Sequence, residues 1–335
     1  MRVLITGVAG QDGTILSHLL EREASEVIGL VKPGHDRDDL VRLKRYAPSL
    51  DLVECDLSDS ELLRDIVVEN RPDQIFNFGG ISSVVESINN PDLTHQINVG
   101  SVEAILSAMR TLKSQGIESR LVAAASGTIF EGVDRSPQTE NTEISPNSPY
   151  AQSKAEVIQM LRAARSKEGI FATSAILYNH ESPLRGEGFV TRKISMAVAR
   201  IAAGLQETLE LGNIEVARDW GWAPDYVNGM RLMLGHAVPQ DFVLATGISH
   251  RLSYFVEKAF ASAGVVDWKG RVTSTEANQR KIDTNLLVGD SHSAYSDLGW
   301  RHTVDFDSMV AAMVKFDKKL LSMPTLIWTP SSTST

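Results

Sequence analysis

The chain has a single cysteine, Cys55, among its 335 residues. One cysteine excludes an internal disulfide and a cysteine-rich metal site. Long apolar runs are also missing, because no stretch approaches the roughly 18–20 apolar residues that a membrane helix requires. The first residues lack a basic segment followed by an apolar run, which is the pattern of a secretory signal. These absences predict a cytoplasmic protein that does not span a membrane.

Basic residues are scarcer than acidic ones. The chain has 33 Lys and Arg against 42 Asp and Glu, so its net charge is −9. An acidic balance disfavours nucleic acid as a partner, although a few local donors are enough to bind a small phosphorylated ligand. The shares of apolar (42%) and charged (22%) residues are those of a globular protein and exclude a disordered chain.

Short β-rich runs alternate with amphipathic helical segments through the first half of the chain. We predict strands at 3–6, 27–31, 52–55, 74–78, 121–125 and 172–177, and helices at 14–23, 60–69, 94–113 and 150–166. Strands separated by helices indicate right-handed βαβ units. The predicted fold is therefore α/β, with a Rossmann-type doubly wound parallel sheet.

The alternation ends near residue 178, which indicates a second, smaller α/β lobe. We expect the Rossmann domain to span 1–178, with the chain returning to it at 216–247. The smaller lobe is then formed by 179–215 and 248–322, and 323–335 is a flexible Ser/Thr-rich tail.

A glycine-rich loop directly follows the first predicted strand and opens into a helix. Gly7, Gly10 and Gly13 permit a tight turn and a close approach of a pyrophosphate to the backbone. The helix that carries Gln11 and Asp12 adds free N–H groups and a favourable dipole. A plain turn has the same composition, but the strand before the loop and the helix after it favour a dinucleotide cofactor.

The residue after the second strand selects between the two nicotinamide cofactors. An acid there binds the ribose of NAD, whereas a basic residue suits the extra phosphate of NADP. Lys32 follows the strand directly, so we predict NADP; a solvated loop lysine is the alternative. Asp56 and Leu57, after the third strand, are expected beside the adenine, although Asp56 is equally suited to capping a helix.

Three residues in the middle of the chain form a candidate catalytic set. Ser126 follows the fifth strand, and Tyr150 and Lys154 lie four residues apart on one face of a helix. A phenol is a poor base at neutral pH, but neighbouring positive charges favour its anion. Ser126 would bind the same substrate oxygen. His180 and Glu181 are adjacent rather than at metal-ligand spacing, so we predict no metal site.

With these motifs, the chain resembles the extended short-chain dehydrogenases/reductases and, more narrowly, the GDP-mannose 4,6-dehydratase family. The similarity extends from about residue 2 to about 320. Its specific segments are 6–13, 148–154, 179–186, 189–193, 211–213 and 218–221. The resemblance implies a GDP-sugar substrate, an NADP cofactor, a nucleotide-sugar-binding second lobe, and a homodimer or higher homo-oligomer.

Positions that match the family's motifs become candidate substrate contacts. They are Asn179, Glu181, Val190, Lys193, Arg218 and Arg280. Arginine and lysine side chains would neutralise a pyrophosphate. Arg280 is equally compatible with a surface ion pair, since the sequence after it departs from the family pattern.

The family reaction has three stages. Tyr150 removes the proton of the C4 hydroxyl while a hydride passes to NADP+, giving a 4-keto sugar. A general base then removes the C5 hydrogen as the C6 hydroxyl leaves. The hydride finally returns to C6, so the reaction has no net redox change.

One candidate catalytic position departs from the family. The resemblance places a Glu acid/base two residues after the catalytic Ser/Thr, and this chain has Thr128 there. Glu131 lies three residues further on, where we expect the turn to direct it elsewhere. Segment 81–83 and the loop after Lys32 also differ from the family, which affects the sugar contacts and the family's tetramer. Three interpretations stay open: a dehydratase with a displaced acid/base, a GDP-sugar 4-epimerase or 4-keto reductase, and a catalytically weak nucleotide-sugar or NADP-binding protein.

Overall fold

The computed structural model describes residues 1–23, 26–274 and 286–329. Its largest sheet has seven parallel strands in the order β10-β6-β5-β4-β1-β2-β3. They are β1 (Arg2–Thr6), β2 (Glu26–Val31), β3 (Asp51–Glu54), β4 (Gln74–Asn77), β5 (Arg120–Ser126), β6 (Phe171–Leu177) and β10 (Phe242–Leu244). The strand order reverses at β1, which confirms the predicted α/β, doubly wound fold.

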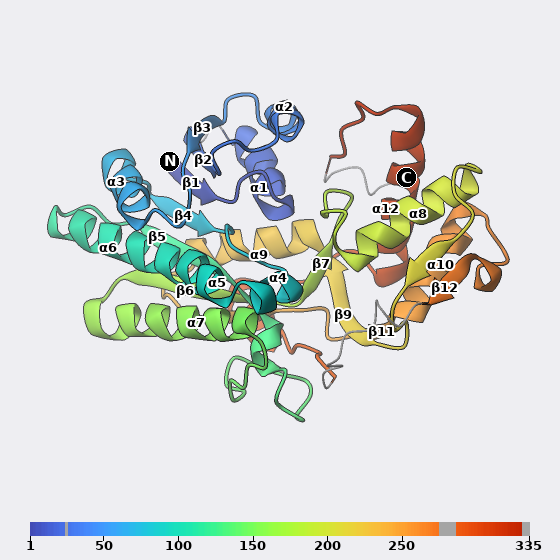
Figure 1. The fold of residues 1–335 in the computed structure, drawn as a ribbon. Coiled ribbons are helices and arrows are strands. Elements are labelled where there is room, and N and C mark those ends of the chain that lie inside the picture. The colour runs from blue at the N-terminus through green and yellow to red at the C-terminus, as the bar shows by residue number, and fades with distance from the viewer. Residues whose placement is uncertain (24–25, 275–285, 330–335) are drawn as a thin grey trace.

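Helices cover both faces of this sheet (Figure 1). Residues Val3 and Ile5 of β1 pack in one core and Leu4 in the other, because successive side chains of a strand point to opposite faces. The first core is shared with α1 (Gln11–Glu21), α2 (Arg37–Tyr46) and α9 (Ala223–Gly235). The second is shared with α3 (Ser60–Asn70), α6 (Gly100–Ser114) and α7 (Pro149–Glu168). Burial on both faces explains why these strands are continuous apolar runs.

The helix expected over 94–113 is interrupted. The structure has α5 (Pro91–Asn98) and α6 in its place, and the short helix α4 (Val84–Asn89) precedes them. The interruption coincides with Asn98, whose buried side chain accepts from Ile81 N (2.8 Å) and donates to Ile81 O (3.0 Å). Apolar periodicity does not reveal such a polar anchor, so the sequence indicated one helix.

The second half of the chain builds two small sheets beside the large one. A three-stranded sheet has the order β11-β9-β7, formed by β7 (Asn179–Glu181), β9 (Ala217–Trp222) and β11 (Ser249–Arg251). A two-stranded sheet pairs β8 (Leu209–Leu211) with β12 (Val272–Ser274). The surrounding helices are α8 (Val190–Ala202), α10 (Leu252–Ala263), α11 (His292–Leu298) and α12 (Phe306–Ser322), with 3-10 turns η1 (Gly127–Phe130) and η2 (Lys269–Arg271).

The expected return of 216–247 to the first sheet needs one correction. Strand β10 does pair with β6, and α9 packs on the large sheet. However, β9 pairs with β7 and β11 instead. Its sequence, ARDWGW, has the charged residues Arg218 and Asp219 near its start and is not the continuous apolar run of a strand in the large sheet. The exact domain boundaries stay a prediction.

The segment that follows α12 is not the flexible tail expected from residue 323. Trp328 is only 5% exposed and packs edge-on against Trp222, with 5.4 Å between the ring centroids. Residues 323–329 are therefore held against the body of the protein, because a buried indole contributes a large apolar surface. Residues 330–335 lie outside the described part of the chain. Within the described ranges, no helix is long and apolar enough to cross a membrane.

Candidate active site

The glycine-rich loop joins β1 to α1 in the geometry of a phosphate cradle. Gly7 has a φ of +65°, and a Cβ there would lie 2.7 Å from the Gly79 backbone. A Cβ on Gly13 would lie 2.5 Å from Cα of Val8. A side chain at either position would clash with this backbone, so both glycines are needed for the close packing of the loop. Helix α1 begins after Gly10 without a side-chain cap, so among the described residues its first N–H groups stay available to an anion.

The two polar residues of the loop reach the start of the chain's second half. Gln11 donates to His180 O (3.1 Å) and accepts from Ser182 Oγ (2.8 Å), and Asp12 pairs with His180 Nε2 at 3.0 Å. Burial alone would lower the pKa of His180, but the charge and hydrogen bond of Asp12 outweigh it and raise that pKa. Gln11 and Asp12 therefore connect the loop to β7 and to the residue that follows it, and their role in binding a cofactor stays a prediction.

The residues expected at the adenosine end lie on the neighbouring strand ends. Lys32 is exposed directly after β2, and Leu57 packs on Gly79, where a Cβ would lie 2.4 Å from Leu57 Cδ1. Hydrogen bonds from Ser58 hold the pKa of Asp56 below its ordinary value, with a smaller contribution from the charge of Lys32. Asp56 therefore fixes the turn before α3 but does not cap the helix, because the cap is Asp59, which accepts from Leu62 N at 3.0 Å.

The candidate catalytic residues meet at the same edge of the sheet as the loop. Ser126 ends β5, and Tyr150 lies in the first turn of α7, whose N-terminus is capped by Ser148 (3.2 Å to Ala151 N). The Ser126 hydroxyl hydrogen-bonds Tyr150. Lys154 is one turn further along α7, with Nζ 5.8 Å from the centre of the Tyr150 ring and 2.8 Å from Ala124 O. The structure therefore brings this predicted trio together.

The electrostatics of the trio leave the phenol protonated. Burial raises the pKa of Tyr150, and the Ser126 hydrogen bond and the charge of Arg185 oppose that rise only in part. Burial also lowers the pKa of Lys154 to about 8. A further positive charge beside the ring, such as that of an oxidised nicotinamide, is what would favour the phenolate.

Thr128 is turned toward Ser126. Its Oγ1 donates to Ser126 Oγ at 3.0 Å, and its N–H is 3.3 Å from the same oxygen. A hydroxyl therefore takes the position at which the resemblance implies a carboxylate. Glu131, which we expected to point elsewhere, is near enough to Tyr150 for its charge to raise the pKa of that phenol.

Two of the expected substrate residues lie on β7, and one has an unexpected environment. Asn179 is half-buried at the start of the strand. Glu181 is 2% exposed; its carboxylate accepts from Thr191 Oγ1 at 2.6 Å and pairs with Arg185 at 3.3 Å. This geometry does not favour the expected direct contact of Glu181 with substrate, because its oxygens already hold α8 and Arg185.

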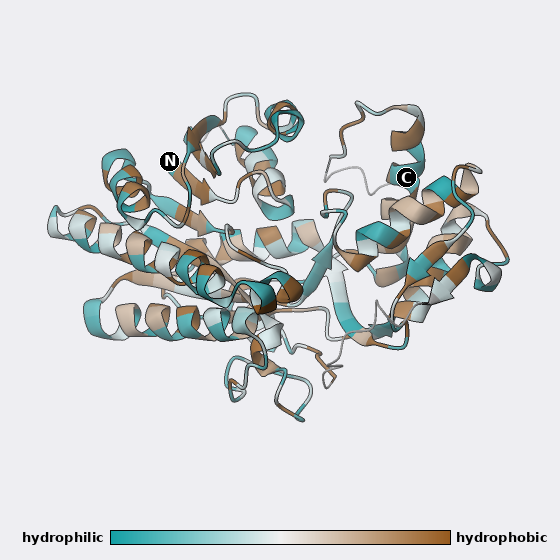
Figure 2. Cartoon of the chain, viewed as in Figure 1, coloured by the Kyte–Doolittle hydropathy of each residue, from teal (hydrophilic) through white to brown (hydrophobic). Residues whose placement is uncertain are grey.

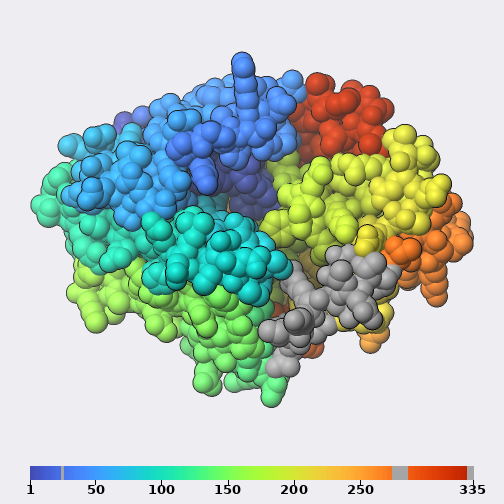
Figure 3. Space-filling view, in the orientation of Figure 1, coloured from blue at the N-terminus to red at the C-terminus, as the bar shows by residue number. Residues whose placement is uncertain are grey.

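The remaining expected contacts flank the second lobe. Val190 and Lys193 are exposed on the first turn of α8, whose N-terminus has no side-chain cap among the described residues. Arg218 lies on β9 opposite His250 of β11, so both side chains are on the same face of that antiparallel pair. Arg280 lies outside the described residues. Figure 3 shows a hollow between the N-terminal half and the yellow-green segment that includes α8, with dark blue N-terminal atoms at its floor.

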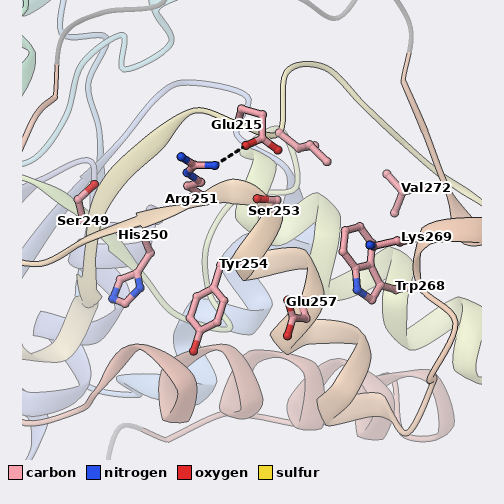
Figure 4. Close-up of a pocket in the computed structure, with 11 residues that line it drawn as sticks. Glu215, Ser249, His250, Arg251, Ser253, Tyr254, Glu257, Trp268, Lys269 and Val272 are labelled. Carbon is pink, nitrogen blue, oxygen red and sulfur yellow. Dashed lines mark hydrogen bonds and ion pairs between the residues drawn. The ribbon is translucent and has the colours of Figure 1, made fainter.

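A groove of about 880 Å³ lies in the second lobe beside β11 (Figure 4). The side chains of His250, Tyr254 and Trp268 supply aromatic rings along it, and Glu257 supplies a carboxylate. Its charged residues balance, since Glu215 pairs with Arg251 at 2.9 Å and Glu257 lies across from Lys269. His250 lines the groove, and Arg218 lies opposite it on β9.

Arg185 was not singled out from the sequence, yet its charge acts on both the glycine-rich loop and the candidate catalytic trio. Its guanidinium stacks 3.6 Å above the Phe189 ring and pairs with Glu181. Its charge adds to the effect of His180 in lowering the pKa of Asp12, and it opposes the rise in the pKa of Tyr150 that burial causes. It lies within the family-like segment 179–186, which is the only signal that the sequence offered. Among the described residues, no group of His, Cys, Asp or Glu is placed to hold a metal ion.

Comparison with known proteins places this geometry in a family. A family model described as GDP-mannose 4,6 dehydratase matches residues 4–313. GDP-mannose 4,6 dehydratase 1 of Arabidopsis thaliana is 37% identical over 325 residues, covering 95% of this chain and 90% of the relative. Among solved structures, UDP-glucose 4-epimerase with UDP-glucose from Thermotoga maritima superposes with a TM-score of 0.83 at 21% identity, covering 96% and 100% of the chains. RMD from Pseudomonas aeruginosa, complexed with NADPH, superposes with 0.76 at 22% identity, covering 95% and 97%.

The two solved structures share the fold, whereas the family match and the 37% identity extend over nearly all of the sequence. The chain therefore belongs to the GDP-mannose 4,6-dehydratase family.

Proposed function

We propose that this protein is an NADP(H)-dependent enzyme that oxidises C4 of a GDP-hexose, with GDP-mannose 4,6-dehydration as its reaction. The observation that carries the proposal is the meeting of Ser126, Tyr150 and Lys154 with the glycine-rich loop at one edge of the sheet. Membership of the dehydratase family supports the substrate, and the neighbour with NADPH supports a nicotinamide cofactor.

The loop at Gly7, Gly10 and Gly13 suits a dinucleotide, because its glycines allow close backbone packing and the α1 N-terminus is open. Lys32 would contact the ribose phosphate that distinguishes NADP from NAD. A bound nicotinamide would temporarily accept a hydride from the sugar. Beside it, Tyr150 takes the proton of the C4 hydroxyl, and Ser126 orients that oxygen by a hydrogen bond. Lys154 stabilises the phenolate by its charge.

The second lobe would hold the nucleoside diphosphate. Lys193 and Arg218 neutralise the pyrophosphate, assisted by the open N-terminus of α8 beside Val190. Because Arg218 lies opposite His250, a diphosphate bound there leaves the base next to the groove of Figure 4. The aromatic rings of Tyr254 and Trp268 suit a planar base.

A second candidate is supported by the Thr128 hydroxyl at 3.0 Å from Ser126 Oγ. A hydroxyl cannot accept a proton from carbon near neutral pH, so the elimination lacks its expected base. The alternative is a GDP-sugar 4-epimerase or 4-keto reductase, which needs only the C4 redox step. A third candidate is a binding protein with little turnover. The presence of all three residues of the trio argues against it.

One experiment separates these functions. The protein is incubated with NADP+ and GDP-mannose deuterated at C4, and the product is followed by NMR and mass spectrometry. Deuterium at C6 with loss of water supports the dehydratase, and inversion at C4 without a change of mass supports the epimerase. Consumption of NADPH only with a 4-keto GDP-sugar supports the reductase. If the protein binds the GDP-sugar but catalyses none of these reactions, the result would support a binding protein and refute the enzymatic proposal.

Two further features belong to this proposal. We infer a cytoplasmic location from the acidic, cysteine-poor composition, and a homodimer or higher homo-oligomer in which α6 and α7 pair with a second copy. Light scattering of the purified protein tests the proposed oligomeric state. A measured molecular mass equal to that of one chain at micromolar concentration would contradict it.

A further inference from the structure

The C-terminal segment crosses from one half of the molecule to the other. It leaves α12 at Ser322 and brings Trp328 between Trp222 of β9 and Tyr46 of α2. The backbone N–H of Trp328 donates to the Tyr46 hydroxyl at 2.9 Å, and the indole ring meets Trp222 edge-on at 5.4 Å. Figure 3 shows the red C-terminal atoms against the blue N-terminal half. All three aromatic residues are at most 5% exposed.

Helix α2 has few other attachments. Six of the ten residues in its sequence RDDLVRLKRY are charged, and only Leu43 and Tyr46 are buried. Figure 2 accordingly shows α2 as largely hydrophilic. The segment adds a second contact, from Arg45 Nη1 to Thr325 O at 3.1 Å. A helix with so small an apolar face depends on these contacts for its position.

The position of α2 matters because both ends of it adjoin the cofactor half-site. The helix follows the loop that begins at Lys32, and at its other end Tyr46 O accepts from His18 on α1, the helix of the glycine-rich loop (3.0 Å). The Tyr46 and His18 rings also meet edge-on at 5.9 Å. Displacing Tyr46 would therefore disturb the two elements that flank the adenosine end of the site.

The C-terminal segment starts from α12, which is packed against the elements that carry the proposed nucleotide-sugar contacts. A buried ion pair joins Arg192 of α8 to Asp317 of α12. Helix α8 also carries Lys193, and Trp222 ends the strand that carries Arg218. The segment thus spans from the elements of the nucleotide-sugar half-site to those of the cofactor half-site.

We propose that Trp328 is a positioning residue that holds α2 against β9 and thereby sets the affinity of the cofactor half-site. The nature of the ligand rests on the proposed function, whereas the docking of α2 does not. The indole anchors the segment to Trp222, and the backbone of the segment holds Tyr46 and Arg45 of α2. Loss of the indole would therefore release the segment and with it α2 and the Lys32 loop. The Ser126–Tyr150–Lys154 trio, which is built on β5 and α7, would keep its geometry.

The test compares Trp328→Ala with Met323→Ala, a control on the same segment whose side chain is 56% exposed. NADPH affinity is measured by the quenching of protein fluorescence and by calorimetry, and the docking of α2 by the rate of tryptic cleavage after Arg42, Lys44 and Arg45. We expect Trp328→Ala to weaken NADPH about tenfold and to accelerate cleavage in α2, with kcat at saturating NADP+ unchanged. Tyr46→Phe keeps the ring but removes the acceptor, so a two- to threefold weakening is expected.

A purely structural role would lower the Tm without changing the affinity for NADPH, and that result would overturn the proposal. The proposal would also be overturned if α2 is cleaved at the wild-type rate both in Trp328→Ala and in a chain that ends at Met323. Should Trp328→Ala fail to fold, Tyr46→Phe decides, because it removes one hydroxyl and leaves the core intact. Wild-type protein that does not bind NADPH would instead refute the proposed cofactor, and the cleavage of α2 would still report on Trp328.

Discussion

At the residue scale, Thr128 is the position that distinguishes the proposed dehydration from the alternative reactions. Its hydroxyl bonds Ser126 but cannot serve as a carbon acid/base, and the loss of such a group costs roughly 10²- to 10⁴-fold in rate. We therefore expect Thr128→Glu to raise the rate of water loss from GDP-mannose by at least about 10². The measurement is the appearance of the 4-keto-6-deoxy product by NMR, with Thr128→Gln as the matched uncharged control. An equal rate in both variants would show that Thr128 is not what limits the elimination.

The second residue-scale prediction concerns pH. Burial lowers the pKa of Lys154 to about 8, so its ammonium is present below that pH and is lost above it. Because the ammonium favours the phenolate of Tyr150, kcat should fall about tenfold per pH unit above pH 8. Lys154→Arg keeps its charge at all accessible pH values, so the variant should lose this alkaline limb even if its kcat is lower. An alkaline limb that persists in the arginine variant would assign it to another group.

At the element scale, α8 and α12 are joined by the buried pair Arg192–Asp317. Burial raises the pKa of Asp317 to about 6, against the opposing charge of Arg192. Asp317→Ala would leave a buried guanidinium without a partner, which costs about 3–5 kcal/mol. For a chain of this length the Tm should fall by about 4–7 °C. Replacing both residues, Arg192→Met with Asp317→Leu, should recover most of the loss in a thermal unfolding scan, and a double variant as unstable as the single one would contradict this account.

The elements also show which parts of the structure the sequence could predict. The large sheet was predictable because a strand buried on both faces is a continuous apolar run, as in β1 and β5. The small sheet of β7, β9 and β11 was not, since its strands are three to six residues long and pair across distant segments. The same division holds for the site. Ser126, Tyr150 and Lys154 follow from strand ends and helical spacing, whereas the burial of Glu181 depends on partners that local sequence does not specify.

At the scale of the whole molecule, the net charge of −9 is compatible with the two sites that we propose for phosphorylated ligands. Their donors are local: the open N-termini of α1 and α8, with Lys32, Lys193 and Arg218 beside them. Acidic residues over the rest of the surface disfavour nucleic acid without weakening such sites, because exposed charges beyond about 10 Å are screened by salt. Recognition of phosphate is therefore a property of helix ends and a few side chains, which a composition average does not describe.

Linkage between ligand binding and folding tests this arrangement across the whole chain. A ligand at 100 times its Kd stabilises the folded state by about 2.7 kcal/mol, which for 335 residues corresponds to about 4 °C in Tm. With Lys32 beside the ribose, NADPH should raise the Tm more than NADH at equal concentration, as measured by calorimetry. Lys32→Ala should remove most of that difference while leaving the stabilisation by NADH unchanged, because the glycine cradle binds the pyrophosphate common to both. Equal stabilisation of the unaltered protein by NADH and NADPH would place the selection of cofactor away from Lys32 and refute the preference for NADP.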